Sequence, residues 1–178
     1  MPAEPAIAKP ALAPAPSAPT TARLIVHFIE SIKNVLETMA GITVTVGAPT
    51  LKAEPVPAYD VSGIIGFSGE FIGSMVVSFE QFAARTIVKA FSGSDPPIDS
   101  SDFADAVGEL ANMIAGSAKK SFGGTTSITV PSVIIGRGHT IARLHDVPCI
   151  VIPCHTSTGD FAVEVNIKPQ KPGGAAGN

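Results

Sequence analysis

Two short connections between apolar, strand-like stretches constrain the fold of this chain most strongly. Gly69-Glu70 separates one pair of stretches, and residues 157–160 separate the last pair. Connections this short join antiparallel neighbours, because parallel strands need long crossovers. We therefore predict two hairpins within a mostly antiparallel sheet. The predicted strands span residues 42–46, 60–67, 71–79, 127–135, 147–154 and 161–168.

Three other stretches have the periodicity of amphipathic helices. They begin near Thr21, at Gln81 and at Asp102, and Gly41 and Gly93 follow the first two. A glycine just after the last helical residue is a common helix stop. The order α-β-β-β-α-α-β-β-β predicts an α+β fold, with helices packed on a mostly antiparallel sheet. The same order argues against the alternating βαβ units of a doubly wound nucleotide-binding sheet.

The last predicted strand has two different faces. Strict alternation of this kind is typical of a strand with one buried face and one face in solvent. We predict that its mixed face is wet. The apolar face comprises Phe161, Val163, Val165 and Ile167, and the mixed face comprises Ala162, Glu164 and Asn166.

The two ends of the chain differ from the rest in composition. Residues 1–20 are almost entirely Pro and Ala, and residues 169–178 are rich in Pro and Gly. Such segments cannot bury enough apolar surface to offset the entropy of ordering. We therefore predict a disordered tail on each side of one domain that spans residues 21–168.

Charge and hydropathy exclude several classes of partner. The 178 residues have a net charge of −3 at pH 7, and no basic cluster suits a nucleic-acid backbone, so no nucleic-acid partner is expected. No apolar run is long enough to span a bilayer, and the first residues lack the pattern of a signal peptide. We expect no membrane contact and a cytoplasmic location.

The metal-binding and redox residue types are sparse. Cys149 and Cys154 lie five positions apart in one predicted strand, so their side chains point to opposite faces and no disulfide is expected. The chain has no Cys-x-x-Cys pair, and its 4 histidines lack ligand spacing. We therefore expect no metal site.

The third predicted helix carries the pattern that bears most directly on function. Each helical residue advances by about 100° around the axis. The side predicted to face the core carries Phe103, Val107, Leu110, Ile114 and Ala118. A narrow arc on the opposite side carries Asp105, Glu109, Asn112 and Gly116.

Two interpretations of this polar stripe are open on the residues alone. Most surface helices have a solvated polar face of this kind. However, Asn112 competes for backbone hydrogen bonds, and Gly108 and Gly116 each cost about 1 kcal/mol relative to Ala inside a helix. A helix that gives up stability on its exposed side in this way favours a flat surface for a partner.

The helix resembles the signature of the CheC/CheX/FliY phosphatase family. That signature is Asp or Ser, three residues, Glu, two residues, Asn and a later Pro. Asp105, Glu109 and Asn112 match it, and Pro131 is the matching proline. The stretches Asp60-Val-Ser-Gly-Ile-Ile-Gly-Phe-Ser-Gly and Val147-Pro-Cys-Ile-Val-Ile-Pro also resemble CheX. A single Glu-x-x-Asn helix is similar to CheX rather than CheC, which carries two.

The resemblance implies a protein phosphatase of chemotaxis or related two-component signalling. Its substrate would be the aspartyl phosphate of a CheY-like response regulator. Asn112 would orient the attacking water, and Glu109 would pair with the active-site lysine of the regulator. Asp105 and Pro131 would support these two catalytic residues.

The resemblance also implies how the protein meets its partners. Gly108 and Gly116 would belong to the partner-binding surface, and the family forms homodimers. No cofactor of its own is implied, and Mg²⁺ is expected in the site of the regulator. The alternative is a non-catalytic adaptor that binds a receiver domain or a flagellar switch component. The presence of both Glu109 and Asn112 favours the enzyme.

Overall fold

The computed structural model describes residues 21–52, 59–122 and 125–170. The predicted tail at residues 1–20 lies outside this part, as does nearly all of the tail at 169–178, although Pro169 itself ends a strand. The predicted helices and hairpins are confirmed. The elements are α1 (Thr21–Ala40), β1 (Thr45–Val46), β2 (Thr50–Leu51), β3 (Val61–Gly69), β4 (Phe71–Phe79), α2 (Gln81–Ser92), α3 (Ser101–Lys120), β5 (Thr126–Ile128), β6 (Ser132–Ile135), β7 (Ile150–Thr156) and β8 (Gly159–Pro169).

The 8 strands of the described residues form one sheet, and all their pairings are antiparallel. Their order is β1-β7-β8-β4-β3-β5, with β2 also paired to β7 and β6 also paired to β3. The last strand among the described residues, β8, therefore lies in the middle of the sheet between β7 and β4. The predicted α+β fold with a mostly antiparallel sheet is confirmed.

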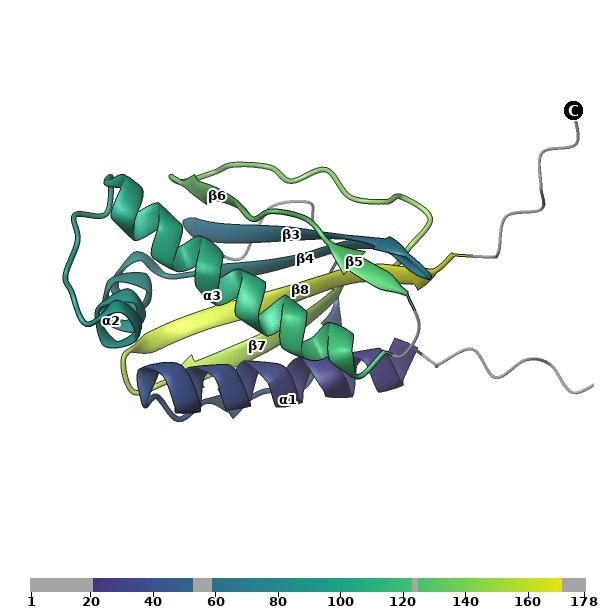
Figure 1. Ribbon diagram of the computed structural model, residues 1–178, viewed down its shortest axis with the longest axis horizontal. Helices are drawn as coiled ribbons and strands as arrows, with labels where there is room; N and C mark the ends of the chain where they lie inside the picture. The colour runs from purple at the N-terminus through teal and green to yellow at the C-terminus, as the bar shows by residue number, and fades with distance from the viewer. Residues whose placement is uncertain (1–20, 53–58, 123–124, 171–178) are drawn as a thin grey trace, which may run out of the picture.

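The helices cover one face of this sheet (Figure 1). α1 and α3 lie side by side across it, and α2 lies near the end where α3 begins. The core between helices and sheet is apolar, and Phe28, Ile32, Met75 and Val163 are fully buried there. The residues predicted for the core face of α3 are all buried, because their helical spacing matches one side of an amphipathic helix.

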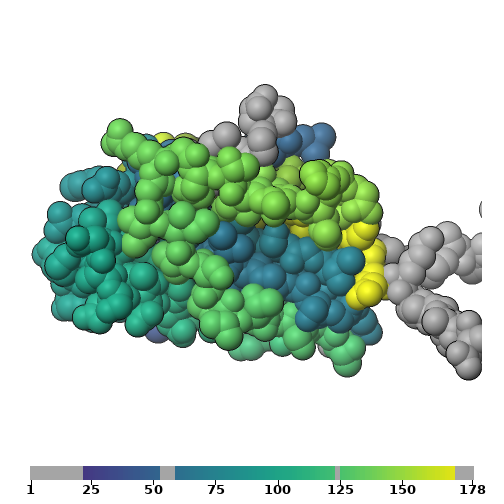
Figure 2. Space-filling model, turned by 90° about the horizontal axis from the view of Figure 1, so that it is seen from above, coloured from purple at the N-terminus to yellow at the C-terminus, as the bar shows by residue number. Residues whose placement is uncertain are grey.

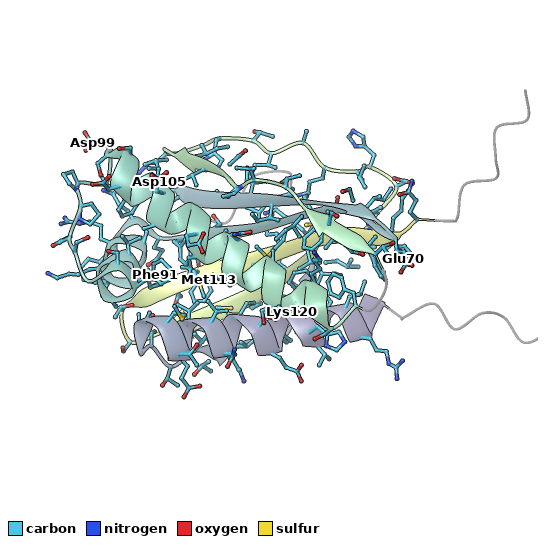
Figure 3. The ribbon with its side chains drawn as sticks, viewed as in Figure 1. Glu70, Phe91, Asp99, Asp105, Met113 and Lys120 are labelled. Atoms are coloured by element: carbon cyan, nitrogen blue, oxygen red, sulfur yellow. The ribbon has the colours of Figure 1, made fainter. Side chains whose placement is uncertain are left out.

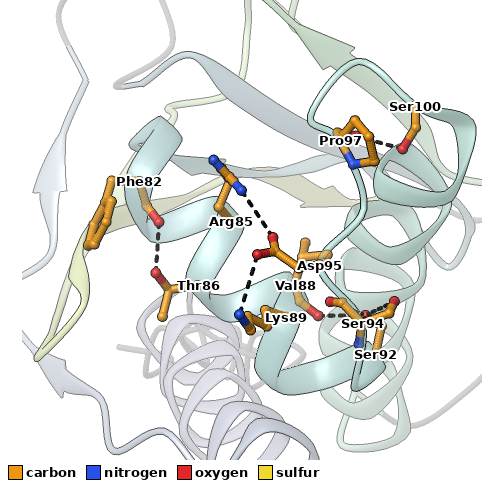
Figure 4. Close-up of polar contacts among 10 residues, drawn as sticks. All are labelled: Phe82, Arg85, Thr86, Val88, Lys89, Ser92, Ser94, Asp95, Pro97 and Ser100. Carbon is orange, nitrogen blue, oxygen red and sulfur yellow. Dashed lines mark hydrogen bonds and ion pairs between the residues drawn. The ribbon is translucent and has the colours of Figure 1, made fainter.

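The connection from α2 to α3 is tied back to α2 by one carboxylate. Asp95 accepts hydrogen bonds from Arg85 at 3.2 Å and from Lys89 at 3.3 Å (Figure 4). These bonds, that of Arg85 first, hold the pKa of Asp95 below its ordinary value. Gly93 ends α2 with φ of 71°, a left-handed conformation that suits glycine. The connection thereby sets where α3 begins.

The face of the sheet away from the helices is covered by residues 136–149, which we call the back cover. Figure 2 shows this green segment, which follows β6, running alongside the blue atoms of β3 and β4. The prediction that one face of β8 lies in solvent is wrong, because Ala162, Glu164 and Asn166 are only 3%, 1% and 2% exposed. The sequence of the back cover has neither helical nor strand periodicity, so local sequence patterns do not predict that this segment covers the sheet.

Polar contacts hold the back cover on the sheet. Glu164 forms ion pairs with Arg143 of the cover and with Lys52, which follows β2. Asn166 accepts a hydrogen bond from the backbone of Leu144 at 3.0 Å and donates one to the backbone of Val147 at 2.7 Å. The buried polar groups of β8 are therefore satisfied, as burial requires.

The single strand predicted at residues 127–135 is interrupted. β5 and β6 both pair with β3, but Phe67 lies opposite Ile128 while Ile64 lies opposite Ser132. Two residues of β3, 65–66, thus lie opposite three residues, 129–131, so the strand that contains β5 and β6 has one extra residue at this point. This is a β-bulge, a feature that bends a strand and changes the aim of its side chains.

Several smaller predictions concern chemistry away from α3. Cys149 and Cys154 are both free, and burial raises the pKa of Cys154 to about 12, so its reactive thiolate form is scarce. Within the described ranges, no helix has the length and hydropathy of a membrane span. No cluster of metal-ligating His, Cys, Asp or Glu side chains occurs among those residues either.

Candidate functional site on the outer face of α3

The ends of α3 are well defined by local interactions. Ser100 caps the start, where its Oγ accepts a hydrogen bond from the backbone N–H of Phe103 at 3.2 Å, and serine is one of the residues favoured at this position. Asp102 lies in the first turn, and Lys119 and Lys120 lie in the last. These charges complement the helix dipole at both ends. The helix is thus a stable support for the side chains in its middle.

Two close approaches position α3. A Cβ atom at Gly63 of β3 would lie 2.9 Å from the Cβ atom of Ala111, so only glycine lets the helix come this near to the sheet. On its flank, a Cβ atom at Gly108 would lie 3.2 Å from Cγ of Pro131. The prediction that Gly108 lies on the exposed side is wrong, because Pro131 packs over it and buries it.

The predicted polar stripe does lie on the outer side of the helix. Asp105 and Glu109 are exposed, and Asn112 and Gly116 are half-buried. Figure 3 labels Asp105 near the start of α3 and Lys120 at its end. Along α3 the side chains therefore change from the acidic Asp105 and Glu109, through the amide of Asn112, to the basic Lys119 and Lys120 of the last turn.

The side chains of Glu109 and Asn112 make no hydrogen bond or ion pair to any described residue. They lie three positions apart, a spacing that puts neighbouring side chains on one face of a helix. A carboxylate there accepts hydrogen bonds or pairs with a cation, and a neutral amide both donates and accepts. A rigid helix thus presents two adjacent groups whose polar atoms are available to another molecule.

A hollow of about 540 Å³ adjoins Glu109 on the side of the bulge. Asp105, Gly108 and Glu109 line it from α3, and Val130, Pro131 and Val133 line it from the bulge and β6. A second hollow, of about 430 Å³, lies between α1 and α3 beside Gly116. Glu109 therefore borders one depression of the surface, and Gly116, at the other end of the stripe, borders the second.

Sequence reasoning missed several residues of this surface. It found Pro131 but not its contact with Gly108, and it did not single out Val130, Lys119 or Lys120. The available signal was a proline within a predicted strand, since proline there marks a bulge or an edge. That signal points to an irregularity but not to the helix that it touches.

Comparison with known proteins finds one family. The family model described as chemotaxis phosphatase CheX matches residues 61–155, which run from β3 into β7 and include all of α3. The chain is also 29% identical over 151 residues to "CheY-P phosphatase CheX" of Thermotoga maritima, a match that covers 83% of this chain and 97% of the relative.

Solved structures agree with this match. The crystal structure of CheX from Desulfovibrio desulfuricans is similar with a TM-score of 0.74 and 39% identity, covering 83% of this chain and 99% of that one. CheX in a CheX–CheY–BeF3–Mg²⁺ complex from Borrelia burgdorferi is similar in fold, with a TM-score of 0.68 and 22% identity over 82% of this chain and 97% of that one.

Proposed function

Because this chain belongs to the CheX family of chemotaxis phosphatases, we propose that it hydrolyses the aspartyl phosphate of a CheY-like response regulator. The relative from Thermotoga maritima is named for activity on phosphorylated CheY. CheX from Borrelia burgdorferi has been crystallised with CheY. These names support both the reaction and the class of partner.

The observation that carries the proposal is the unpartnered pair of Glu109 and Asn112 on the outer face of α3. An acyl phosphate is already reactive, so its hydrolysis needs mainly a water held in line and no repulsion of the phosphoryl group. A helix held by a cap and by two close approaches meets the first need, because it presents a fixed side chain. A neutral amide meets the second.

In this mechanism the Asn112 carboxamide accepts a hydrogen bond from the attacking water and orients it towards phosphorus. The water oxygen forms the new bond to phosphorus, and the bond to the aspartyl oxygen breaks. The carboxylate of the regulator keeps the electron pair, and both water protons leave with the phosphate. Mg²⁺ would come with the regulator and neutralise charge on the phosphoryl oxygens.

Glu109, which lies one helical turn from Asn112, would pair with the active-site lysine of the regulator and so dock the two proteins. A charge-assisted hydrogen bond of this kind is directional and fixes the register of the two proteins. The same docking would bring the phosphoryl group over Asn112. A carboxylate in the position of Asn112 would instead repel the phosphoryl group.

The other predicted residues take supporting parts in the proposal. Pro131 packs on Gly108 and so holds the bulge against α3 beside Glu109, while Asp105 extends the acidic end of the stripe. Gly116 leaves the surface beyond Asn112 open. We include in the proposal one domain over residues 21–168 between two tails, a homodimer and a cytoplasmic location.

The test is the rate of phosphate loss from a phosphorylated CheY-type receiver with the wild-type protein and with Asn112→Ala. We expect Asn112→Ala to slow the catalysed loss by about 100-fold, the usual cost of removing one positioned polar group. Gln81→Ala, which removes an amide from an exposed position at the start of α2, is the matched control and should act as the wild type does.

Binding separates the alternatives. If Asn112→Ala binds the receiver as tightly as the wild type but has lost the rate, the water-positioning role is supported. If the wild type binds the receiver and never accelerates phosphate loss, the protein is an adaptor and the proposed reaction is wrong.

A further inference from the structure

Val130 is the most exposed large hydrophobic residue in the described part of the chain, at 85%. A single exposed apolar side chain is ordinary on a protein surface. What distinguishes Val130 is its place, at the centre of the bulge between β5 and β6. A bulge next to a functional site often serves to aim one side chain.

The neighbours of Val130 are both fixed. Thr129 donates its backbone N–H to the carbonyl of Gly66 at 3.0 Å, and its Oγ1 accepts the N–H of Gly66 at 2.9 Å. On the other side, Pro131 packs against Gly108 of α3. Val130 is therefore held outwards between an anchor on the sheet and an anchor on the helix.

The side chain lies on the wall of the same hollow as Glu109. That hollow has Asp105 and Glu109 on its helix side, and Val130 and Pro131 on its bulge side. An apolar wall and a carboxylate without a partner among the described residues thus face one depression. A partner that enters this hollow to bring a cation to Glu109 therefore comes close to the side chain of Val130.

We propose that Val130, supported by Pro131, is an apolar docking residue for the receiver domain of the response regulator, and that it sets affinity for the partner without taking part in the chemistry. This inference rests on the proposed function, because it names the partner of the same site. Covering Val130 excludes water from the pairing of Glu109 with the partner's lysine, and apolar neighbours strengthen a polar contact in this way.

The rigidity of the bulge gives the anchor its effect. Ordering a loop on binding costs conformational entropy, and a side chain that is already held avoids this cost. Val130 is not a catalytic residue in this account, since it touches neither the water nor the phosphoryl group. Its loss should therefore change the half-saturating receiver concentration and leave the turnover rate alone.

The experiment measures phosphate loss as a function of the concentration of phosphorylated receiver for the wild type, Val130→Ser and Val130→Ile. We expect Val130→Ser to raise KM by about tenfold at unchanged kcat, as the loss of most of one buried valine contact implies. Val130→Ile, which keeps an apolar side chain at this position, should have the same KM as the wild type. Leu51→Ser, at a residue that is 71% exposed on the edge strand β2, is the control and should have no effect.

Two results would overturn the inference. One is a KM for Val130→Ser equal to that of the wild type. The other is a dimer that becomes monomeric in Val130→Ser by sedimentation, with receiver binding unchanged, because the residue would then serve a second copy of the chain.

Direct titration of the receiver keeps this inference apart from the proposed reaction. If the wild type binds the receiver without accelerating phosphate loss, the proposed reaction fails, and the Kd of Val130→Ser still decides the docking role. If the wild type does not bind any receiver, both fail.

Discussion

A glutamate and an asparagine lie close together in two regions of this protein, with opposite consequences. On the outer face of α3, Glu109 and Asn112 have no partner among the described residues. On the back of β8, Glu164 and Asn166 are buried and bonded to the back cover and to Lys52. The residue types are the same, and the spacing suits the helix in one case and the strand in the other.

The difference shows what separates a structural polar pair from a functional one. A buried carboxylate and a buried amide must form their hydrogen bonds within the fold, since an unsatisfied buried polar group lowers the free energy of unfolding. A pair on the surface of a rigid helix keeps its hydrogen bonds for another molecule. Residue type and spacing do not distinguish the two cases, whereas the partners present in the fold do.

Removing the buried carboxylate should have the largest effect on stability. Glu164→Ala takes away the anion that neutralises Lys52 and Arg143, whose side chains are only 9% and 11% exposed. Breaking a buried ion pair in this way costs about 3–5 kcal/mol. Urea unfolding should show this loss, and the matched variant Glu109→Ala should change the free energy of unfolding by no more than about 0.5 kcal/mol.

Equal stability of the two glutamate variants would break the comparison. It would mean that the cations of the back face turn to solvent without cost, and that the back cover is not held by charge.

Removing the buried amide should have a smaller effect in the same direction. Asn166→Ala leaves the backbone groups of Leu144 and Val147 without their hydrogen-bond partner, which costs about 1–3 kcal/mol for a buried group. The matched variant Asn112→Ala should raise the free energy of unfolding slightly, because alanine has a higher helix propensity than asparagine. Urea unfolding of both variants measures the contrast, and a loss of stability in Asn112→Ala would show that this amide also supports the fold.

The smallest effect is expected where an ion-pair network is fully in solvent. Asp95 pairs with Arg85 and Lys89 at the surface of α2 (Figure 4), and exposed pairs contribute little. Asp95→Asn should leave the midpoint of thermal unfolding at pH 7 almost unchanged. Because these pairs lower the pKa of Asp95 from its ordinary value of 3.8, any contribution is present above that pH and is lost as the pH falls through the folded-state pKa.

The contrary result is easy to recognise. A large drop in the midpoint at pH 7 that persists in strong acid would show that Asp95 acts through the shape of the α2–α3 connection rather than through its charge.

The sequence predicts best those features that depend on neighbours along the chain. The helical stripe of α3 follows from spacing alone, as do the two hairpins. The outer position of Glu109 and Asn112 follows in the same way, because the core face of a helix determines its opposite face.

Features set by distant segments are the ones that sequence reasoning misses. Alternation in β8 predicts a wet face, but a segment without periodicity closes over Glu164 and Asn166. Gly108 looks like an exposed glycine until Pro131, more than twenty positions later, packs on it. In both cases the burial depends on where an irregular segment lies, and local patterns do not encode that.

The central place of β8 has a consequence for how the protein is made. β7 with its partners β1 and β2, and β4 with β3 and its partners, join only through β8 in the sheet. A ribosome releases β8 after every other strand of the described residues, so the edges of β4 and β7 that pair with β8 lack this partner until residue 169 emerges. Unpaired edges invite wrong pairings, so the nascent chain is most exposed to mispairing in the interval before β8 has emerged.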